Sequence, residues 1–214
     1  MDSIRLEHTF PEVFAKRSDL QSDVWQQDVT FERGKLYLVE ADSGTGKSSL
    51  CSFIYGYRQD YQGIITFDDQ NIRNLKTRDW TRLRRNNLSL MWQELRLFPE
   101  LTAMENVMIK NRLTGFKRRK QILEWFDALG ISDKVDTKVG IMSYGQQQRV
   151  ALMRALAQPI DFLFVDEPIS HLDDGNARQM ADVMMEEATR QGAGVVVTSI
   201  GKHVDMNYDK ILHL

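Results

Sequence analysis

The stretch Ala41-Asp42-Ser43-Gly44-Thr45-Gly46-Lys47-Ser48 decides the fold of this chain. It follows the apolar run 36–39, which predicts a strand, and leads into residues 48–55, which predict a helix ended by Gly56. Glycines let such a loop curl until successive backbone N–H groups point at phosphate oxygens, and the helix adds its positive N-terminal end. A strand, this loop and a helix in that order therefore predict a phosphate-binding site.

Each position of the loop has an expected task. Lys47 should reach the β- and γ-phosphates of a nucleotide, and the Ser48 hydroxyl should bind Mg²⁺. The strictest form of the pattern starts with Gly, whereas this chain has Ala41; alanine is small, so we expect the loop to keep its shape. A plain turn before a helix is the structural alternative, which the strand-to-helix context disfavours. The predicted nucleotide-binding set is Ala41, Asp42, Ser43, Gly44, Thr45, Gly46, Lys47, Ser48 and Ser49.

A second acidic site is expected on a neighbouring parallel strand. Residues 160–165 form a nearly continuous apolar run, as in a strand covered on both faces, and Asp166-Glu167-Pro168 follow it. Asp166 at the strand end can hold Mg²⁺ through its water shell, and Glu167 can polarise an attacking water. Acidic residues entering a turn are common, but the phosphate loop already requires such a strand.

Composition narrows the class of protein. The chain has 214 residues, with 42% apolar and 27% charged residues, a net charge of −2 and a single cysteine, Cys51. No apolar run approaches the roughly 20 residues needed to span a bilayer, and the N-terminal residues lack the apolar core of a secretion signal. We expect a globular protein of a reducing compartment, with no direct membrane insertion and no general attraction to nucleic acid.

The remaining pattern alternates strands with helices. Residues 63–67, 88–92 and 195–198 predict strands, and helices are expected from 103, over 119–129 with Ile122, Leu123, Phe126 and Leu129 on one stripe, over 145–158 and over 175–190. This alternation predicts an α/β fold with an open parallel sheet. We expect a single domain, 1–214, with one lobe from about 1–74 and 159–214 and a helical lobe over about 75–158.

Further motifs carry a family resemblance. Ser143-Tyr144-Gly145-Gln146-Gln147 resembles the Leu-Ser-Gly-Gly-Gln signature of ATP-binding cassette (ABC) ATPases. Met91-Trp92-Gln93 with the segment 97–102 is similar to the Q-loop of that family, and Ser170-His171-Leu172-Asp173 to its D-loop. The resemblance covers nearly the whole chain in the right order, and the segment 97–107 is most similar to the cassettes of lipoprotein release, macrolide export and cell division.

The resemblance implies a P-loop NTPase of ABC ATPase type, with an antiparallel β edge and an inserted helical subdomain. It implies that ATP and Mg²⁺ are bound between two cassettes, a homodimer or a pair with a paralogue, with Ser143, Gly145 and Gln146 facing the nucleotide of the partner and Asp173 crossing the interface. Gln93 would contact Mg²⁺ and the attacking water. The implied catalytic set is Glu167, Gln93 and Ser199, and the implied metal ligands are Ser48, Gln93 and Asp166.

Two positions depart from the family pattern. Tyr144 stands where the signature has its first glycine, and a ring there adds bulk and restricts φ. Ser199 stands where the family has its switch histidine, and serine cannot bridge water and phosphate as an imidazole does. His203 could reach back only if a helix began at Ser199, and a surface histidine is the favoured interpretation. His171 is another candidate and is no better supported. Because Glu167 is present, we expect slow ATPase activity rather than none.

Several aromatic and basic residues leave alternatives open. We expect Phe14 to stack on adenine, with Phe10 or simple core packing of either ring as the alternatives. Trp25 lies on an apparent strand pattern, so we expect it to be buried in the core. Leu95, Leu97 and Phe98 could line a groove for a helix of a transmembrane subunit, or could be core. The basic stretches 82–85 and 117–120 lack interleaved aromatics, so a solvated helical face is the default.

The leading functional prediction is the ATP-binding subunit of a membrane ABC complex, which couples ATP binding and hydrolysis to movement of a separate permease. Such a subunit would be cytoplasmic, held on the inner face of the cell membrane through its permease. The alternative is a slowly hydrolysing, nucleotide-dependent scaffold or regulator. ABC proteins of ribosomes or DNA join two cassettes or carry long coiled coils, for which 214 residues leave no room.

Overall fold

A parallel sheet forms the centre of the computed structural model, which describes residues 1–17, 21–168, 173–201 and 203–214. Its five strands run in the order β6 (Leu88–Met91), β7 (Phe162–Asp166), β8 (Gly194–Ser199), β3 (Leu36–Glu40) and β9 (Lys210–His213), and every neighbouring pair is parallel. The carboxyl ends of β3, β7 and β8 therefore lie along one edge of this sheet. The predicted α/β class with a parallel core is confirmed.

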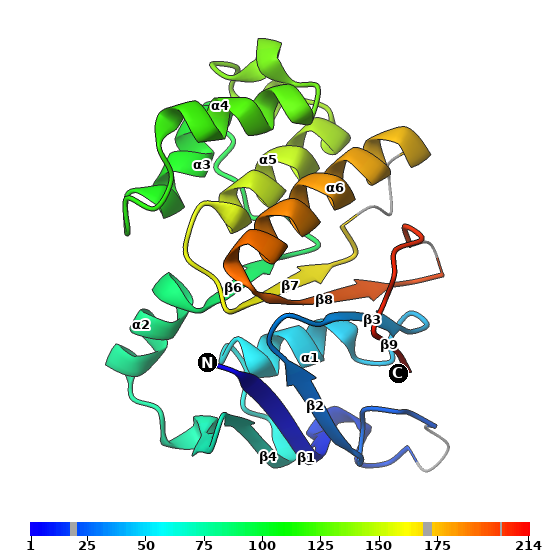
Figure 1. Ribbon diagram of the computed structural model, residues 1–214. Helices are drawn as coiled ribbons and strands as arrows, with labels where there is room; N and C mark the ends of the chain where they lie inside the picture. The colour runs from blue at the N-terminus through cyan, green and yellow to red at the C-terminus, as the bar shows by residue number, and fades with distance from the viewer. Residues whose placement is uncertain (18–20, 169–172, 202) are drawn as a thin grey trace.

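Strands from the N-terminal part of the chain form a second, antiparallel sheet. Its order is β2 (Asp28–Glu32), β1 (Ser3–Pro11), β4 (Tyr61–Phe67) and β5 (Gln70–Asn71), so these strands form a sheet of their own. Short 3₁₀ turns follow at Glu12–Phe14 and Ile72–Asn74. The phosphate loop is followed by α1 (Lys47–Ile54), which lies between the two sheets in Figure 1.

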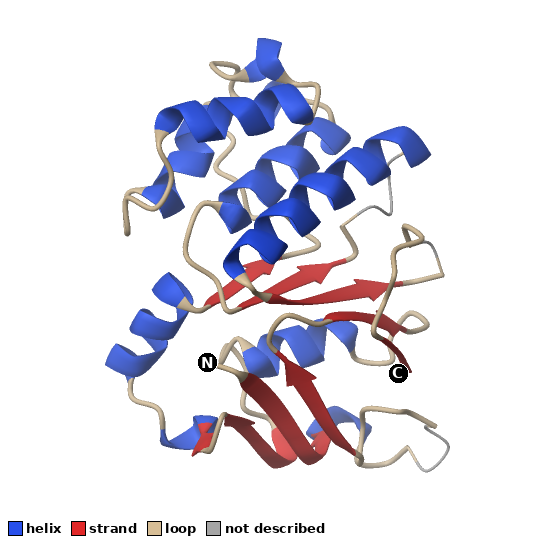
Figure 2. Cartoon of the chain, viewed as in Figure 1, coloured by secondary structure: helices blue, strands red, loops and turns tan. Residues whose placement is uncertain are grey.

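The helices cover the other face of the parallel sheet, as the colouring of Figure 2 makes plain. They are α3 (Ala103–Asn111), α4 (Arg119–Ala128), α5 (Tyr144–Leu156) and α6 (Asp174–Gln191), with 3₁₀ turns at Ser132–Lys134 and Val139–Ile141; α2 (Thr77–Asn86) leads into β6. Side chains of β3 alternate between two cores: Leu36 and Leu38 pack with α3–α6, and Tyr37 and Val39 pack with α1 and the antiparallel sheet. This alternation explains why the strands read as continuous apolar runs.

Most of the predicted elements are present within one or two residues. The predicted stripe of the 119–129 helix is wrong at Leu123, which is 39% exposed, while Ile122, Phe126 and Leu129 are buried. The strand β6 lies in the parallel sheet, although its residues fall within the segment 75–158 predicted for the helical lobe. Among the described residues, no helix has both the length and the apolar composition that a membrane span requires.

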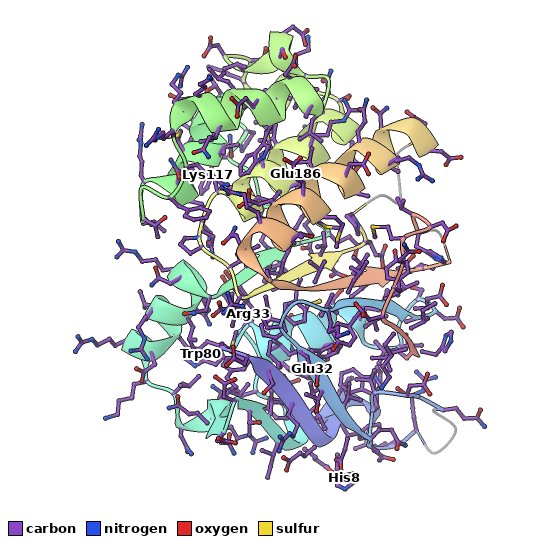
Figure 3. The ribbon with its side chains drawn as sticks, viewed as in Figure 1. His8, Glu32, Arg33, Trp80, Lys117 and Glu186 are labelled. Carbon is purple, nitrogen blue, oxygen red and sulfur yellow. The ribbon has the colours of Figure 1, made fainter. Side chains whose placement is uncertain are left out.

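The turn after α1 depends on Gly56. Its φ is +70°, and a Cβ there would lie 2.5 Å from the ring of Trp80, the side chain labelled in Figure 3 beside α2. We expect Gly56→Ala to lower the free energy of unfolding by roughly 2–4 kcal/mol, because both the left-handed backbone and the close approach are penalised. Chemical denaturation measures this change.

Gly130→Ala is the matched control for that substitution. Gly130 also follows a helix with a left-handed φ, +65°, but a Cβ there would have nothing within 4 Å. It should therefore show only the cost of the backbone conformation, about 1 kcal/mol. Equal losses in the two variants would contradict the role assigned to Trp80.

Candidate nucleotide-binding site

The loop between β3 and α1 has the conformation that the sequence predicts. Gly44 and Gly46 have φ values of +82° and +107°, and a Cβ on Gly46 would lie 3.0 Å from ring atoms of both Phe14 and Trp25. The Lys47 side chain folds back over the loop, where its Nζ donates to the carbonyl oxygens of Ala41 and Asp42, each at 3.1 Å. Ala41 is not among the described residues with positive φ, so its Cβ is accommodated in the loop.

A cavity of about 280 Å³ opens over this loop. Phe14 lines it together with Ser43, Gly44, Gly46, Lys47, Ser48 and Ser49 from the loop and the first turn of α1. Gln93, Glu167 and Ile200 complete the lining. Phe14 therefore lies beside the phosphate loop, whereas Phe10, whose ring centroid is 6.3 Å from that of Phe14, does not line the cavity.

Trp25 supports the loop from beneath. It is buried, as predicted, but it lies in a turn before β2, so the predicted strand is wrong at this position. Its Nε1 donates a hydrogen bond of 2.9 Å to the Thr45 carbonyl oxygen. Sequence reasoning missed this contact, because nothing in the local pattern links a tryptophan to a loop 20 residues further on.

The end of β7 brings the predicted acidic pair to the loop. Asp166 is buried, and its Oδ2 accepts a hydrogen bond of 3.0 Å from Ser48 Oγ. Its Oδ1 accepts from the Thr198 hydroxyl on the neighbouring strand, a partner that the sequence did not single out. Oxygen ligands of this kind, one hydroxyl and one carboxylate, are those that Mg²⁺ prefers, so Ser48 and Asp166 fit a magnesium ion beside phosphates.

Glu167 and Gln93 form the opposite wall. Gln93 Nε2 donates to Glu167 Oε2 at 3.0 Å, and Glu167 Oε1 lies 3.7 Å from Lys47 Nζ. The backbone of Glu167 is left-handed, with φ of +49°, and its N–H bonds to the Thr198 carbonyl oxygen at 3.2 Å. Five segments of the chain thus meet at one cavity, and the Glu167 carboxylate faces Lys47, the lysine predicted to bind phosphate.

The residues predicted to act on a partner's nucleotide lie elsewhere. Ser143 caps α5 with a reciprocal pair of bonds, Gln146 N–H to Ser143 Oγ at 3.3 Å and Ser143 N–H to Gln146 Oε1 at 3.0 Å. Neither these residues nor Gly145 line the described cavity of their own chain. Asp173 caps α6 by accepting from the Asn176 N–H at 2.9 Å. Ser170, His171 and Leu172 lie outside the described residues.

Tyr144, the departure in the signature, contacts the Q-loop of its own chain. Its hydroxyl donates to the Gln93 carbonyl oxygen at 2.9 Å, and its side chain is partly exposed. Burial, with the nearby carboxylates of Glu94 and Glu167, raises the pKa of the phenol, so it remains a donor at neutral pH. The residue that displaces a glycine therefore links the start of α5 to the backbone of Gln93.

Tyr144→Phe tests that link. Removing one hydroxyl should lower ATP turnover about 3- to 10-fold, because a hydrogen bond contributes about 0.5–1.5 kcal/mol. Its loss frees the backbone of Gln93, whose side chain donates to Glu167. The Kd for ATP should stay unchanged, which steady-state turnover and fluorescent-nucleotide titration measure together. Tyr144→Gly adds the effect of removing the ring, and equal turnover in wild type and Tyr144→Phe would contradict the link.

Ser199, predicted to stand where the family has its switch histidine, lies beside the phosphate loop. Ser199 ends β8, is buried, and its carbonyl oxygen accepts from the Ala41 N–H at 3.1 Å. The described residues that follow are not helical, and His203 Nδ1 lies 3.2 Å from Glu40 Oε1. The less favoured prediction for His203, that it reaches back to the site, is therefore wrong, because its ring is directed at Glu40 and the described residues after Ser199 form no helix. The favoured prediction is a surface histidine, and the side chain is 31% exposed.

The apolar cluster beside Gln93 divides between core and surface. Leu95 is buried and Leu97 packs against the core, so the groove prediction is wrong for Leu95. Phe98 is 52% exposed and lines a second cavity, of about 210 Å³, whose other lining residues come from the turn after α1, from β6 and the loop that follows it, and from α3 and α5. The sequence could not separate these three residues, because their order in the loop carries no helical or strand period.

Comparison with known proteins agrees with this geometry. An uncharacterized ABC transporter ATP-binding protein of Mycobacterium tuberculosis is 32% identical over 184 residues, which cover 85% of this chain but only 56% of the relative. The lipoprotein-releasing system ATP-binding protein LolD of Syntrophotalea carbinolica is 29% identical, with 93% of this chain and 88% of the relative covered. The chain thus spans little more than half the length of some curated relatives.

Solved structures share the fold. The dimeric structure of MJ0796, a bacterial ABC transporter cassette, superposes with a TM-score of 0.76 at 26% identity, covering 92% of this chain and 87% of that one. The family model described as ABC transporter matches residues 25–170. That match includes 146 of the 214 residues and spans the phosphate loop, the Q-loop and the acidic strand end. The chain belongs to the ABC transporter family.

Proposed function

We propose that this chain is the ATP-binding subunit of a membrane ABC complex, and that it couples ATP binding and hydrolysis to movement of a separate permease. The observation that carries the proposal is the meeting of Lys47 and Ser48 with Asp166, Glu167 and Gln93 around one cavity. The loop would bind the phosphates, Ser48 and Asp166 would hold Mg²⁺ with Gln93 nearby, and Glu167 would accept a proton from the attacking water. Bound Mg²⁺ would neutralise charge that develops on the phosphates.

A second cassette is part of the proposal. Ser143, Gly145 and Gln146 do not line the cavity of their own chain, so they would complete the site of a homodimeric or paralogous partner, with Asp173 at the interface. The dimeric structure of MJ0796 supports this arrangement for a chain of the same family.

Phe14 would stack on adenine, because it lies at the edge of the phosphate cavity. The lobes would be residues 1–74 with 159–214, and 75–158.

The expected location follows from the partner. A cassette of this kind would lie at the inner face of the cell membrane, held there by its permease and without inserting itself. The exposed Phe98 beside the Q-loop supports a permease contact. The similarity to LolD supports the lipoprotein-release, macrolide-export and cell-division subgroup.

We further propose that turnover is slow. Tyr144 replaces a signature glycine, and Ser199 replaces a group that could bridge water and phosphate. These departures also support the second candidate function, a nucleotide-dependent scaffold or regulator of a membrane complex. ATP hydrolysis by the purified chain at a rate typical of a complete cassette, with no change in rate in Ser199→Ala, would contradict slow turnover.

Turnover measured with and without the membrane subunit, in matched samples, tests the function. Strong stimulation by the membrane subunit supports a transport motor, and a flat low rate supports the scaffold. If the chain bound no magnesium nucleotide either with or without the membrane subunit, both candidate functions would be wrong.

A further inference from the structure

The end of β8 places a buried threonine, Thr198, beside the acidic pair of the nucleotide site. β7 and β8 are parallel neighbours whose register pairs Asp166 with Thr198, so the carboxyl ends of the two strands lie side by side (Figure 1). Thr198 has no exposed surface, and it is not among the described residues that line the nucleotide cavity. Any effect of its side chain on the site therefore passes through the residues that it contacts.

The Thr198 hydroxyl is shared between both acidic residues. It donates to Asp166 Oδ1 at 2.5 Å and accepts from the Glu167 backbone N–H at 3.3 Å. The same N–H also donates to the Thr198 carbonyl oxygen at 3.2 Å. A hydroxyl carries one hydrogen, so donating it to Asp166 leaves the oxygen free to accept from Glu167. One side chain thus binds the carboxylate of Asp166 and the backbone of Glu167 at once.

The bond to Asp166 fixes how its carboxylate is turned. With Oδ1 bound by Thr198, Oδ2 is the oxygen that faces the phosphate loop, where it accepts from Ser48 Oγ at 3.0 Å. Turning the plane of the carboxylate breaks both bonds, and Asp166 is only 1% exposed, so water cannot readily replace them. Thr198 therefore stabilises the orientation in which one Asp166 oxygen lies beside Ser48, at the site that fits Mg²⁺.

The bonds to the Glu167 backbone hold a conformation that costs energy. Its φ is +49°, which is left-handed, and a residue with a Cβ keeps such a backbone only where its surroundings hold it. Two oxygens of Thr198 do so by accepting from the Glu167 N–H. From this backbone the side chain extends into the cavity, where Oε2 accepts from Gln93 Nε2 at 3.0 Å. The direction of the Glu167 carboxylate therefore depends on Thr198.

We propose that Thr198 is a positioning residue for ATP hydrolysis: its hydroxyl orients Asp166 toward the Mg²⁺ site and holds Glu167 where it can accept a proton from water. The inference rests on the proposed function and adds a residue that lines no part of the nucleotide cavity. Removing the hydroxyl should weaken metal binding and slow turnover together, because both acidic residues lose a bond. ATP binding without metal should stay unchanged, since the phosphate loop keeps Lys47 and its backbone N–H groups.

Thr198→Val and Thr198→Ser separate the hydroxyl from the shape of the side chain. Valine keeps the branched shape without the hydroxyl, whereas serine keeps the hydroxyl. In Thr198→Val we expect the affinity of the ATP-bound chain for Mn²⁺, measured by electron paramagnetic resonance, to fall about 10-fold, and turnover to fall about 10- to 100-fold. Thr198→Ser should restore both to within about threefold of wild type. Metal-free titration with a fluorescent ATP analogue should give the same Kd for all three chains.

Thr9→Val is the matched control. Thr9 also has no exposed surface, and its hydroxyl donates to the Ile64 carbonyl oxygen at 3.1 Å, but Thr9 lies on β1 and is not among the described residues that line the cavity. Its substitution should lower thermal stability and leave metal affinity and turnover unchanged.

Thermal melting shows whether each variant is folded. If Thr198→Val does not fold, Thr198→Ser against Thr198→Ala makes the same comparison with a smaller side chain. Wild-type metal affinity and turnover without the hydroxyl overturn the inference, and so do equal losses with and without it. Either result, with ATP binding intact, leaves the proposed function standing.

Discussion

Replacing Lys47 with alanine is expected to weaken ATP binding about 100-fold or more. The ammonium group lies over the phosphate loop, where it donates to the Ala41 and Asp42 carbonyl oxygens and faces Glu167 at 3.7 Å. Two charge-assisted hydrogen bonds to phosphate, at about 1.5–3 kcal/mol each, would be lost with it. Titration with a fluorescent ATP analogue, or calorimetry, measures the change.

Lys120→Ala is the control for this substitution, because Lys120 is an exposed lysine far along the chain on α4. It should bind ATP as wild type does. Circular dichroism and thermal melting of both variants separate a binding defect from misfolding. An unchanged Kd in folded Lys47→Ala would remove the basis of the proposed function, since no other described lysine lines the cavity.

Glu167→Gln is expected to lower ATP turnover by about 10²- to 10⁴-fold while ATP binding persists. The amide keeps the shape of the side chain and one oxygen for the Gln93 Nε2 donor, but it cannot take a proton from water. Removing a negative charge that faces the phosphate site should leave ATP affinity equal or higher. The ATP-bound dimer should therefore accumulate, which size-exclusion chromatography with light scattering detects.

Glu186→Gln provides the matched change on the surface. Glu186 lies exposed on α6, where Figure 3 labels it, and it is not among the described residues that line the nucleotide cavity. Its turnover should match wild type. Turnover in Glu167→Gln within twofold of wild type would show that another group acts as the base, and the assignment of Glu167 would be wrong.

Much of the fold could be predicted from local patterns in the sequence. The loop 41–48 shows a clear order of strand, glycines and lysine. The helix expected from 103 begins there, with a capping box in which Glu105 N–H donates to Thr102 Oγ1 at 3.2 Å. The apolar run before Asp166 predicted a buried parallel strand, and β7 is that strand. These features depend on residues that are close together in the sequence, so they can be predicted from the sequence alone.

Contacts between distant segments could not be predicted in the same way. Leu123 fits the helical stripe by spacing, yet its side chain is 39% exposed because none of the described elements covers that position. The bonds from Trp25 to Thr45 and from Tyr144 to Gln93 join segments 20 and 51 residues apart. Such contacts depend on how the two sheets and the helical layer are assembled, and neither hydrophobic period nor residue type encodes that assembly.

The indole beneath the phosphate loop also gives the molecule an optical reporter. Indole emission changes with the hydrogen bonding and polarity around the ring, and the Trp25 N–H is bonded to the loop whose backbone would rearrange around phosphate. None of the four tryptophans is among the described residues that line the nucleotide cavity, but the ring N–H of Trp25 bonds to the phosphate loop. Ligand entry should therefore alter the emission spectrum of the unlabelled chain mainly through one ring, which makes rapid-mixing kinetics possible without a dye.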